Sequence, residues 1–598
     1  MKRILTIAFC LAIALLCSAC ALAEDETVQI VLSSSGITAG DAKGVSVDGS
    51  TVTIRNKGTY VLSGELAGGQ IIVDAGGKDK VTLILNGVSV VNASAPALMV
   101  ENAKLTVLRL AAGTENKLVS GEPVDVKTSS ADEAAEGGAI HARDSLRIEG
   151  DGALTVGGYL NNGIHTSNHL TILGGLITVE AVNHGIKGKD SVLIEEGVIT
   201  VTSGKDGVIS NDASGEGYGV VTIRGGTLTI DAAGDGIQAE TLLDISGGTL
   251  NIVSGGGSAD VEYDEPDDWG GWRGGRGADF GWMPDGGRGM DFGWGPGTDF
   301  GEDVDDSLST KGLKSGTALT ISGGVITVDA RDDAVHSNGG ITISGGELTL
   351  SSGDDGIHAD ASLTVEDGLI NILASYEGME ANQLLIAGGE MDIVSADDGL
   401  NAYGGEEMFG FGGRGGFGGR GGRGMNGWGE PQSSGAAEDL PLLRITGGVV
   451  HLNAEGDGLD SNGSIIVEGG EVIVDGPFRS MNGAIDVGTE SGGVCEVHGG
   501  NVLAVGAAGM ADSFGSSSTQ CAFQVTMQGI SAGDDIVVTD SEGRELVRHT
   551  ALKGCASIVF TSPDLILGET YTVTAGGQST TITLDSVSTG GQSMRWGW

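Results

Sequence analysis

Acidic residues recur at one position of a repeated turn along this chain. Doubled aspartates stand at 332/333, 354/355 and 397/398, and a single glutamate holds the same position at 377. Carboxylates held close together repel one another, and a divalent cation relieves that repulsion at neutral pH. Calcium takes about six to eight oxygen ligands in loose geometry, which suits flexible Asp-Gly turns. We therefore predict a calcium-binding cluster formed by Asp332, Asp333, Asp354, Asp355, Glu377, Asp397 and Asp398.

A single Asp-Gly pair has a simpler explanation, because aspartate before glycine is good turn chemistry without any ligand. We assign the isolated Asp206 and Asp235 to this explanation. The doubled acids exceed what a turn requires, and they favour cation binding.

A second polar row lies two residues after the glycine position of each turn. It contains Lys314, His336, His358, Glu380 and Asn401. This row is either a groove that binds an anionic or hydroxyl-rich chain, or a solvent-facing polar ladder. Zinc is not favoured here, because the neighbouring side chains are mostly carboxylates and no cysteine joins them.

The elements that position these residues repeat about every 22 residues, a period typical of solenoids. Each copy consists of an acidic turn, a short β-branched strand, a Gly-Gly corner and a second short strand, and the second corner glycine falls at 324, 346 and 368. Short strands separated by glycine at such a period predict a parallel β-helix with two or three strands in each coil. Inward residues should then form aliphatic ladders, for example Ile321, Ile343, Val365 and Ile386.

The predicted fold is therefore an all-β, parallel β-helix solenoid, and its parts follow from where the repeat is regular. The predicted parts are a signal peptide (1–23), an N-terminal cap with irregular first turns (24–135), the β-helix (136–488), its decaying last turns (489–518) and a small antiparallel β cap (519–598). Two low-complexity insertions rich in Gly, Arg and Trp, at 255–310 and 404–440, interrupt the β-helix.

The N-terminus has the features of an export signal. Lys2 and Arg3 precede an apolar run, and Ala21-Leu22-Ala23 forms a cleavage site, so we expect a secreted or cell-surface protein. An alternative is a lipoprotein with Cys20 acylated. No later stretch is long and apolar enough for a transmembrane segment. The formal net charge of −49 argues against a nucleic-acid partner.

The chain repeatedly combines a turn such as Asp-Asp-Gly-Ile-His-Ala (354–359) with a strand and corner such as Leu319-Thr320-Ile321-Ser322-Gly323-Gly324. In this combination it resembles the secreted clostridial carbohydrate-binding domain family. The resemblance covers most of the mature chain. It implies a pectate-lyase-like right-handed β-helix that binds calcium. It also implies binding of cellulose or polygalacturonate, without established lyase activity. It also implies calcium binding at Asp332, Asp333, Asp354, Asp355, Asp397 and Asp398. Ala334, where the motif has glycine, departs from the pattern.

Three functions remain open from the sequence. The leading hypothesis is a calcium-dependent polysaccharide-binding protein that attaches a cell to plant cell-wall material, with calcium bridging two sets of carboxylates. The second is a calcium-dependent polysaccharide lyase, for which Lys187 or Lys314 would be the base, although neither has a clearly paired arginine. The third is a structural cell-surface adhesin whose ladders serve only rigidity.

Overall fold

The computed structural model describes residues 27–130, 137–263, 309–403, 440–478, 482–509 and 511–590. The predicted signal peptide, Cys20 and most of the two predicted insertions lie outside these residues. Within them, regular secondary structure is β-strand apart from one 3-10 turn, η1 (Thr489–Ser491). The predicted all-β class is confirmed. The same residues contain no helix with the length and apolar character needed to cross a membrane.

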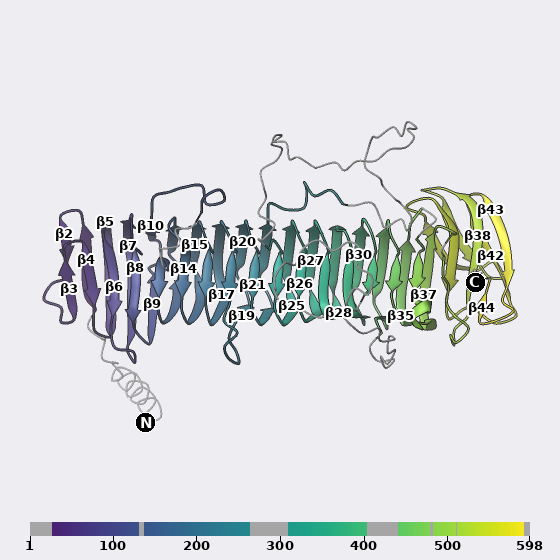
Figure 1. Cartoon of the computed structure of the whole chain (residues 1–598), viewed down its shortest axis with the longest axis horizontal. Helices are drawn as coiled ribbons and strands as arrows, with labels where there is room; N and C mark the ends of the chain where they lie inside the picture. The colour runs from purple at the N-terminus through teal and green to yellow at the C-terminus, as the bar shows by residue number, and fades with distance from the viewer. Residues whose placement is uncertain are drawn as a thin grey trace, which may run out of the picture.

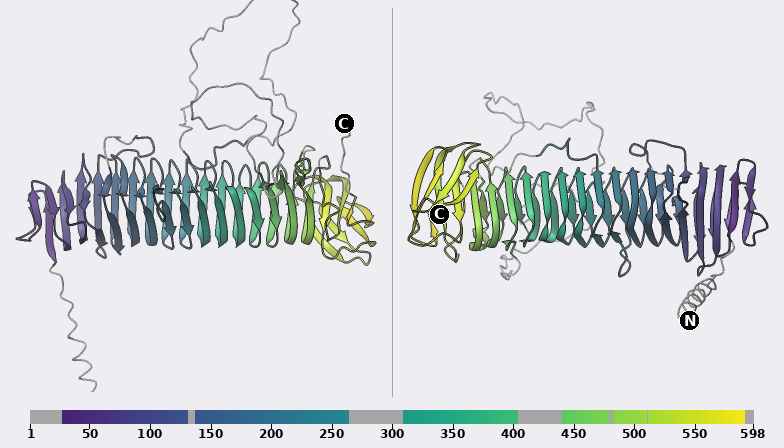
Figure 2. Two further views of the ribbon diagram at one scale, coloured as in Figure 1. Left: turned by 60° about the horizontal axis from the view of Figure 1, so that its bottom comes forward. Right: turned by 180° about the vertical axis from the view of Figure 1, so that it is seen from behind.

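Parallel strands stack into an elongated rod, and most of its coils contribute to three rows of strands (Figure 1, Figure 2). Ile321 pairs with Ile343, Ile343 with Val365, and Val365 with Ile386, so successive coils follow the spacing expected from the repeat. All four side chains are fully buried. Like residues therefore stack at the interstrand spacing of roughly 4.8 Å, and this aliphatic ladder is part of the core that holds each coil on the next.

The first row carries the candidate site. It consists of β6 (Gln70–Asp74), β8 (Leu98–Asn102), β11 (Gly138–Ala142), β14 (Asn162–Thr166), β16 (Ile186–Gly188), β18 (Val208–Ser210), β21 (Ile237–Ala239), β24 (Leu313–Ser315), β26 (Val335–Ser337), the starts of β28 (Ile357–Ala374) and β29 (Met379–Ile386), β31 (Leu400–Ala402), β34 (Leu459–Ser461) and β36 (Ile485–Val487).

The other two rows complete the coil, and several long strands bend through both. The second row consists of β9 (Leu105–Leu110), β12 (Ser145–Gly150), β19 (Val220–Ile223), β22 (Leu242–Ile245), β32 (Leu442–Ile445) and the first halves of β15 (His169–Ala181), β17 (Ser191–Ser203), β25 (Ala318–Ala330), β27 (Gly340–Ser352), β35 (Ser464–Asp475) and β37 (Cys495–Gly506), with the middle of β28 and the end of β29. The third row consists of β10 (Glu115–Ser120), β13 (Ala153–Gly158), β20 (Thr227–Ala232), β23 (Thr249–Ser254), β30 (Glu390–Ser395), β33 (Val449–Ala454) and the ends of the long strands.

Glycine is required at the corner between the second and third rows. The second glycine of each pair has positive φ, for example 101° at Gly324, 102° at Gly346 and 123° at Gly368. A Cβ on Gly346 would lie 3.3 Å from the carbonyl oxygen of Gly324 in the preceding coil. Only glycine adopts this backbone and this approach without strain.

The irregular first turns expected within residues 24–135 belong to the same parallel stack as the regular coils. Parallel pairing already joins β5 (Gly58–Ala67), β7 (Lys80–Asn92) and β9. Gly58 pairs with Val81 and Leu83 with Leu108, so the steps differ from each other and exceed those of the regular coils. These unequal steps hide the repeat in the sequence. Antiparallel pairs close this end, namely β1 (Val28–Ser33) with β2 (Gly36–Thr38) and β3 (Val45–Asp48) with β4 (Thr51–Ile54).

Antiparallel strands cover the opposite end of the rod (yellow in Figure 1). β38 (Ala522–Ile530) and β41 (Cys555–Thr561) continue from β37, β44 (Ser588–Thr589) pairs with β38, and a four-stranded sheet is ordered β40 (Glu545–Thr550), β39 (Asp535–Thr539), β42 (Thr570–Ala575) and β43 (Gln578–Thr583). The β37–β41 pairs join this unit to the rod, and buried Asp475 contributes further contacts. Its Oδ2 lies 2.8 Å from His549 Nε2, and its Oδ1 accepts the Leu552 N–H at 2.9 Å.

Candidate functional site

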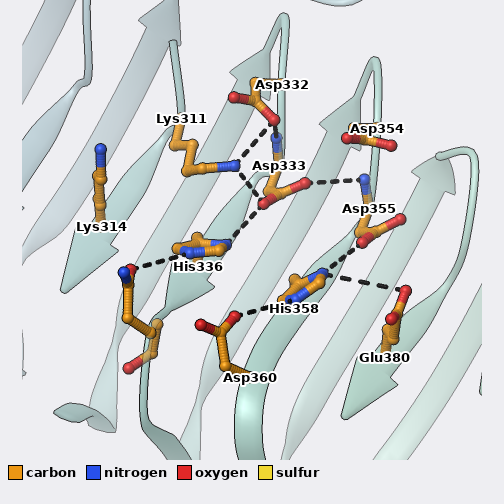
Figure 3. Close-up of polar contacts among 12 residues, drawn as sticks. Lys311, Lys314, Asp332, Asp333, His336, Asp354, Asp355, His358, Asp360 and Glu380 are labelled. Atoms are coloured by element: carbon orange, nitrogen blue, oxygen red, sulfur yellow. Dashed lines mark hydrogen bonds and ion pairs between the residues drawn. The ribbon is translucent and has the colours of Figure 1, made fainter. Parts of the chain in front are cut away.

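The predicted polar row forms a continuous line of paired positions along the first strand row. Lys314, His336, His358, Glu380, Asn401, Asp460 and Asp486 each pair with the next in parallel register. The acidic turns lie immediately before these strands, so their carboxylates stand beside the row. The line therefore runs from basic and imidazole groups to carboxylates in chain order. Figure 3 shows the part of it from Lys314 to Glu380.

Lys311 neutralises the first doubled aspartate. Its ammonium group lies 2.9 Å from Asp332 Oδ1 and 2.5 Å from Asp333 Oδ2. Burial favours the neutral form of the Asp333 carboxyl, but a hydrogen bond from His336 and the charge of Lys311 hold its pKa below the usual range. One Asp354 oxygen also lies within 4.8 Å of ligand atoms of Asp332 and Asp333. This part of the predicted cluster is thus assembled, but a lysine already supplies positive charge to it.

Two aspartates fold back onto the histidines that follow them by three residues. Asp333 Oδ2 lies 2.7 Å from His336 Nδ1, and Asp355 Oδ2 lies 2.7 Å from His358 Nδ1. The two rings stack with their centroids 5.1 Å apart. Burial disfavours the charged His358 ring, but its hydrogen bond to Asp355 and the nearby carboxylates raise its pKa to about 9. His358 is therefore a cation at neutral pH in the metal-free protein.

The following coil places two glutamates together. Burial, followed by the charge of Glu377, raises the pKa of Glu380 to about 11, so Glu380 is a neutral acid at pH 7. Glu377 Oε2 also accepts a hydrogen bond from Asn401 Nδ2 at 2.8 Å. Asn401 is 6% exposed, and its Oδ1 has no hydrogen-bond partner. A buried, unpaired carbonyl oxygen is costly and needs a donor or a cation.

Beyond Asn401 the row and its turns are built from carboxylates. One oxygen each of Asp457, Asp460 and Asp486 lies within 4.8 Å of the others. Asp398 Oδ1 accepts the Asp457 N–H at 2.6 Å. Burial and the charges of Asp460 and Asp457 raise the pKa of Asp398 well above its usual range. Burial raises the pKa of Asp457 to about 7, and the charge of Asp486 adds to this effect. We call Asp397, Asp398, Asp457, Asp460 and Asp486 the oxygen-only section.

The predicted residues therefore do not form one cluster. Asp332, Asp333, Asp354 and Asp355 lie with Lys311 and the histidines, whereas Asp397 and Asp398 lie in the oxygen-only section, with Glu377, Glu380 and Asn401 between them. Lys314 is directed to other partners, because its Nζ lies 3.3 Å from Asp235 Oδ2 and donates to Ser309 Oγ at 2.9 Å.

Lys311, Asp457, Asp460 and Asp486 were not predicted as site residues, although each has a sequence signal. Asp457 precedes Gly458, and Asp460 follows that glycine by two residues. Lys311 precedes Gly312 as Asp333 precedes Ala334, but the insertion 255–310 separates Lys311 from the coil before it. Asp486 pairs with Asp460 after a longer step than the regular coils have. A search for polar residues both directly before the glycine position of each turn and two residues after it, with unequal steps allowed, would have found all four.

Comparison with known proteins places the chain among carbohydrate-related sequences. A family model described as carbohydrate-binding domain-containing protein matches residues 48–356, more than half of the chain. A carbohydrate-binding domain-containing protein of Acetivibrio thermocellus is 36% identical over 163 residues, which is 26% of this chain and 54% of that protein. The match thus spans about half the length of that relative.

One solved structure is also similar in sequence. It is the gadolinium derivative of a polysaccharide lyase-like protein from C. thermocellum, which is 34% identical. The alignment covers 39% of this chain and 92% of that chain, with a TM-score of 0.35.

Proposed function

Because the chain belongs to the family of carbohydrate-binding domain-containing proteins, we propose that it is an exported, calcium-dependent polysaccharide-binding protein with a non-catalytic role in attachment. The proposal includes a right-handed parallel β-helix as its scaffold. Its ligand is cellulose or an acidic plant polysaccharide such as polygalacturonate.

The observation that carries the calcium part is the oxygen-only section. Asp457, Asp460 and Asp486 bring three carboxylates together, and the charges that act most strongly on Asp398 are those of neighbouring carboxylates. The buried Asn401 Oδ1, next to Asp460 in the row, lacks a donor. Carboxylate and amide carbonyl oxygens are the ligands calcium prefers. The donor set therefore fits Ca²⁺, which would supply the positive charge that lets these carboxylates stay ionised.

Placing calcium in the oxygen-only section changes the set of proposed ligands from the one predicted from the sequence. Asp397 and Asp398 remain proposed ligands, and Asp457, Asp460 and Asp486 join them. The pair Asp332 and Asp333 has Lys311 as its counter-ion, so a calcium ion there would compete with a buried ammonium group. Calcium is thus proposed where carboxylates face one another and not where they face Lys311.

The acidic character of the protein explains why a cation would matter for binding a uronate polymer. With a formal net charge of −49, direct contact with another polyanion is repulsive. A bound divalent ion reverses the local charge and offers free coordination positions to uronate carboxylates. The residues of the row pair from one coil to the next along the stack, so an extended polymer can contact several coils at once and gain avidity.

Retention on immobilised polygalacturonate and on cellulose, each with calcium and with chelator, tests the proposal. Calcium-dependent retention without new ultraviolet-absorbing unsaturated ends is expected. Accumulation of unsaturated ends would instead show a lyase. Absence of retention in both conditions would leave a structural adhesin.

A matched pair of variants locates the site. Asp457→Asn with Asp460→Asn should abolish calcium-dependent retention, because it removes two carboxylates of the oxygen-only section. Glu347→Gln with Glu390→Gln makes the same charge change at exposed positions of the third strand row and should leave retention unchanged. Equal loss in both double variants would contradict the assignment.

A further inference from the structure

The histidines of the polar row bring nitrogen donors into the buried carboxylates. His336 and His358 lie in adjacent coils, and each Nδ1 faces the aspartate three residues earlier (Figure 3). Ligand atoms of Asp333, His336 and His358 lie within 4.8 Å of one another, and so do those of Asp355, His358 and Glu380. His358 belongs to both groups. Two overlapping groups of three potential ligands, joined through His358, thus lie on three consecutive coils.

The far side of each ring is held as in a metal-binding histidine. His336 Nε2 lies 3.1 Å from Asn338 Oδ1, and His358 Nε2 lies 3.3 Å from Asp360 Oδ1. An acceptor at Nε2 stabilises the tautomer that carries its proton there, which leaves the Nδ1 lone pair for a ligand. This arrangement is independent of the carboxylates in the two groups, and both histidines share it.

Donor chemistry distinguishes these groups from the oxygen-only section. Calcium takes oxygen ligands, whereas neutral imidazole together with carboxylates suits first-row transition metals. We propose that Asp333, His336, Asp355, His358 and Glu380 form a binding site for a divalent first-row transition metal, with Zn²⁺ as the reference ion. When the metal binds, the proton shared by Nδ1 and Oδ2 in each Asp-His pair and the proton of the Glu380 carboxyl leave to solvent.

This site is separate from the proposed polysaccharide function and does not require it. From the sequence, zinc is disfavoured because most neighbouring side chains are carboxylates. The sequence does not reveal that Asp333 and Asp355 turn back onto His336 and His358. The close-up shows these side chains converging from neighbouring coils (Figure 3).

Zinc titration of the full chain by isothermal calorimetry, with the purification tag removed and millimolar calcium present, tests the proposal. One saturable zinc step is expected, and cobalt in place of zinc should give visible absorption bands of a nitrogen and oxygen coordination sphere. His358→Gln should abolish both signals. Asp360→Asn removes only the support of the ring and should weaken zinc binding by about 10- to 100-fold.

His451→Gln is the matched control. His451 Nδ1 lies 3.0 Å from Asp392 Oδ1 in an exposed Asp-His pair, and neither residue belongs to the groups of potential metal ligands found among the described residues. This variant should bind zinc as the wild type does. No saturable step in the wild type, a step unchanged by His358→Gln and Asp360→Asn, or displacement of zinc by stoichiometric calcium would each overturn the proposal. Circular dichroism of every variant separates these outcomes from misfolding.

Discussion

Lys311 balances the charge at the start of the acidic row, and its removal is predicted to be costly. The Lys311 and Asp333 side chains are 15% and 3% exposed, so the Lys311→Met variant leaves the buried Asp333 carboxylate with His336 but without its lysine counter-ion. Breaking a buried ion pair from one side destabilises by about 3–5 kcal/mol. Urea unfolding, or hydrogen exchange of β24 and β26, measures the loss.

The control for this variant is Lys127→Met. Lys127 pairs with Asp231, but the two side chains are 31% and 48% exposed. A pair this accessible contributes about 0–1 kcal/mol. Equal losses in the two variants would contradict the role assigned to Lys311.

His165 predicts an acid-sensitive step in stability. Its Nδ1 is buried without a hydrogen-bond partner, and its ring stacks on His141 at 4.9 Å. Burial, together with repulsion from His141 and Lys187, lowers the pKa of His165 to about 3 from an ordinary 6.5. Because the folded pKa is depressed, the stabilisation is complete above pH 6.5 and is lost as the pH falls from 6.5 toward 3.

Replacing His165 with glutamine should therefore flatten the acid limb of a plot of unfolding free energy against pH. The difference between wild type and variant should change by a few kcal/mol, on the order of one to two per pH unit, across this window. His451→Gln, at an exposed position, should leave the slope as it is. An unchanged slope in His165→Gln would show that His165 is not the group responsible.

At the scale of the element, the corner glycines fix how one coil meets the next. Gly346 has φ of 102° and lies against the backbone of the preceding coil. Gly346→Ala should destabilise by about 1–3 kcal/mol, since an L residue is strained in this region. The neighbouring variant Ser344→Ala, at an exposed position, should stay within about 0.5 kcal/mol. Denaturant midpoints of the two variants make the comparison, and equal midpoints would contradict it.

The elements were predictable where the repeat is regular. Gly324, Gly346 and Gly368 fix the period, and Ile321, Ile343 and Val365 fix the face that enters the core, because period and burial are local consequences of strand geometry. The coils near β5 and β7 could not be predicted from the repeat, because their steps differ in length and the sequence shows no constant period there. The structure continues the stack through them without changing the row.

The sequence predicted which residue types lie in the turns and the polar row, but not which side chains contact one another. The doubled aspartates lie in the turns beside the polar row, yet spacing cannot show that Lys311 reaches across one coil to Asp332, or that Asp355 turns back onto His358. Those contacts depend on side-chain direction and on coils joined across an insertion. These contacts divide the similar acids into two sections. In one section Lys311 and His358 supply positive charge, and the other is the oxygen-only section.

At the scale of the whole molecule, one buried carboxylate adds to the backbone pairs between β37 and β41 that join the antiparallel unit to the end of the rod. Asp475 is 2% exposed and accepts from the Leu552 N–H, with His549 Nε2 on its other oxygen. Asp475→Ala leaves these groups unpaired and should loosen the unit at a cost of about 1–3 kcal/mol. Hydrogen exchange should rise in β39 to β43 and stay unchanged in β25 to β28. Uniform protection throughout would contradict a local docking role for Asp475.

The direction of the hydrogen bonds between coils has a mechanical consequence. Strands of successive coils pair along the long axis of the rod, and its two ends lie far apart (Figure 1). A pull on those ends therefore opens the bonds of one coil at a time, as in unzipping, and does not shear many together. Each regular coil would release roughly 70 Å of chain at full extension. A cell tethered through such a rod would feel a tether that lengthens stepwise under load and absorbs energy before it breaks.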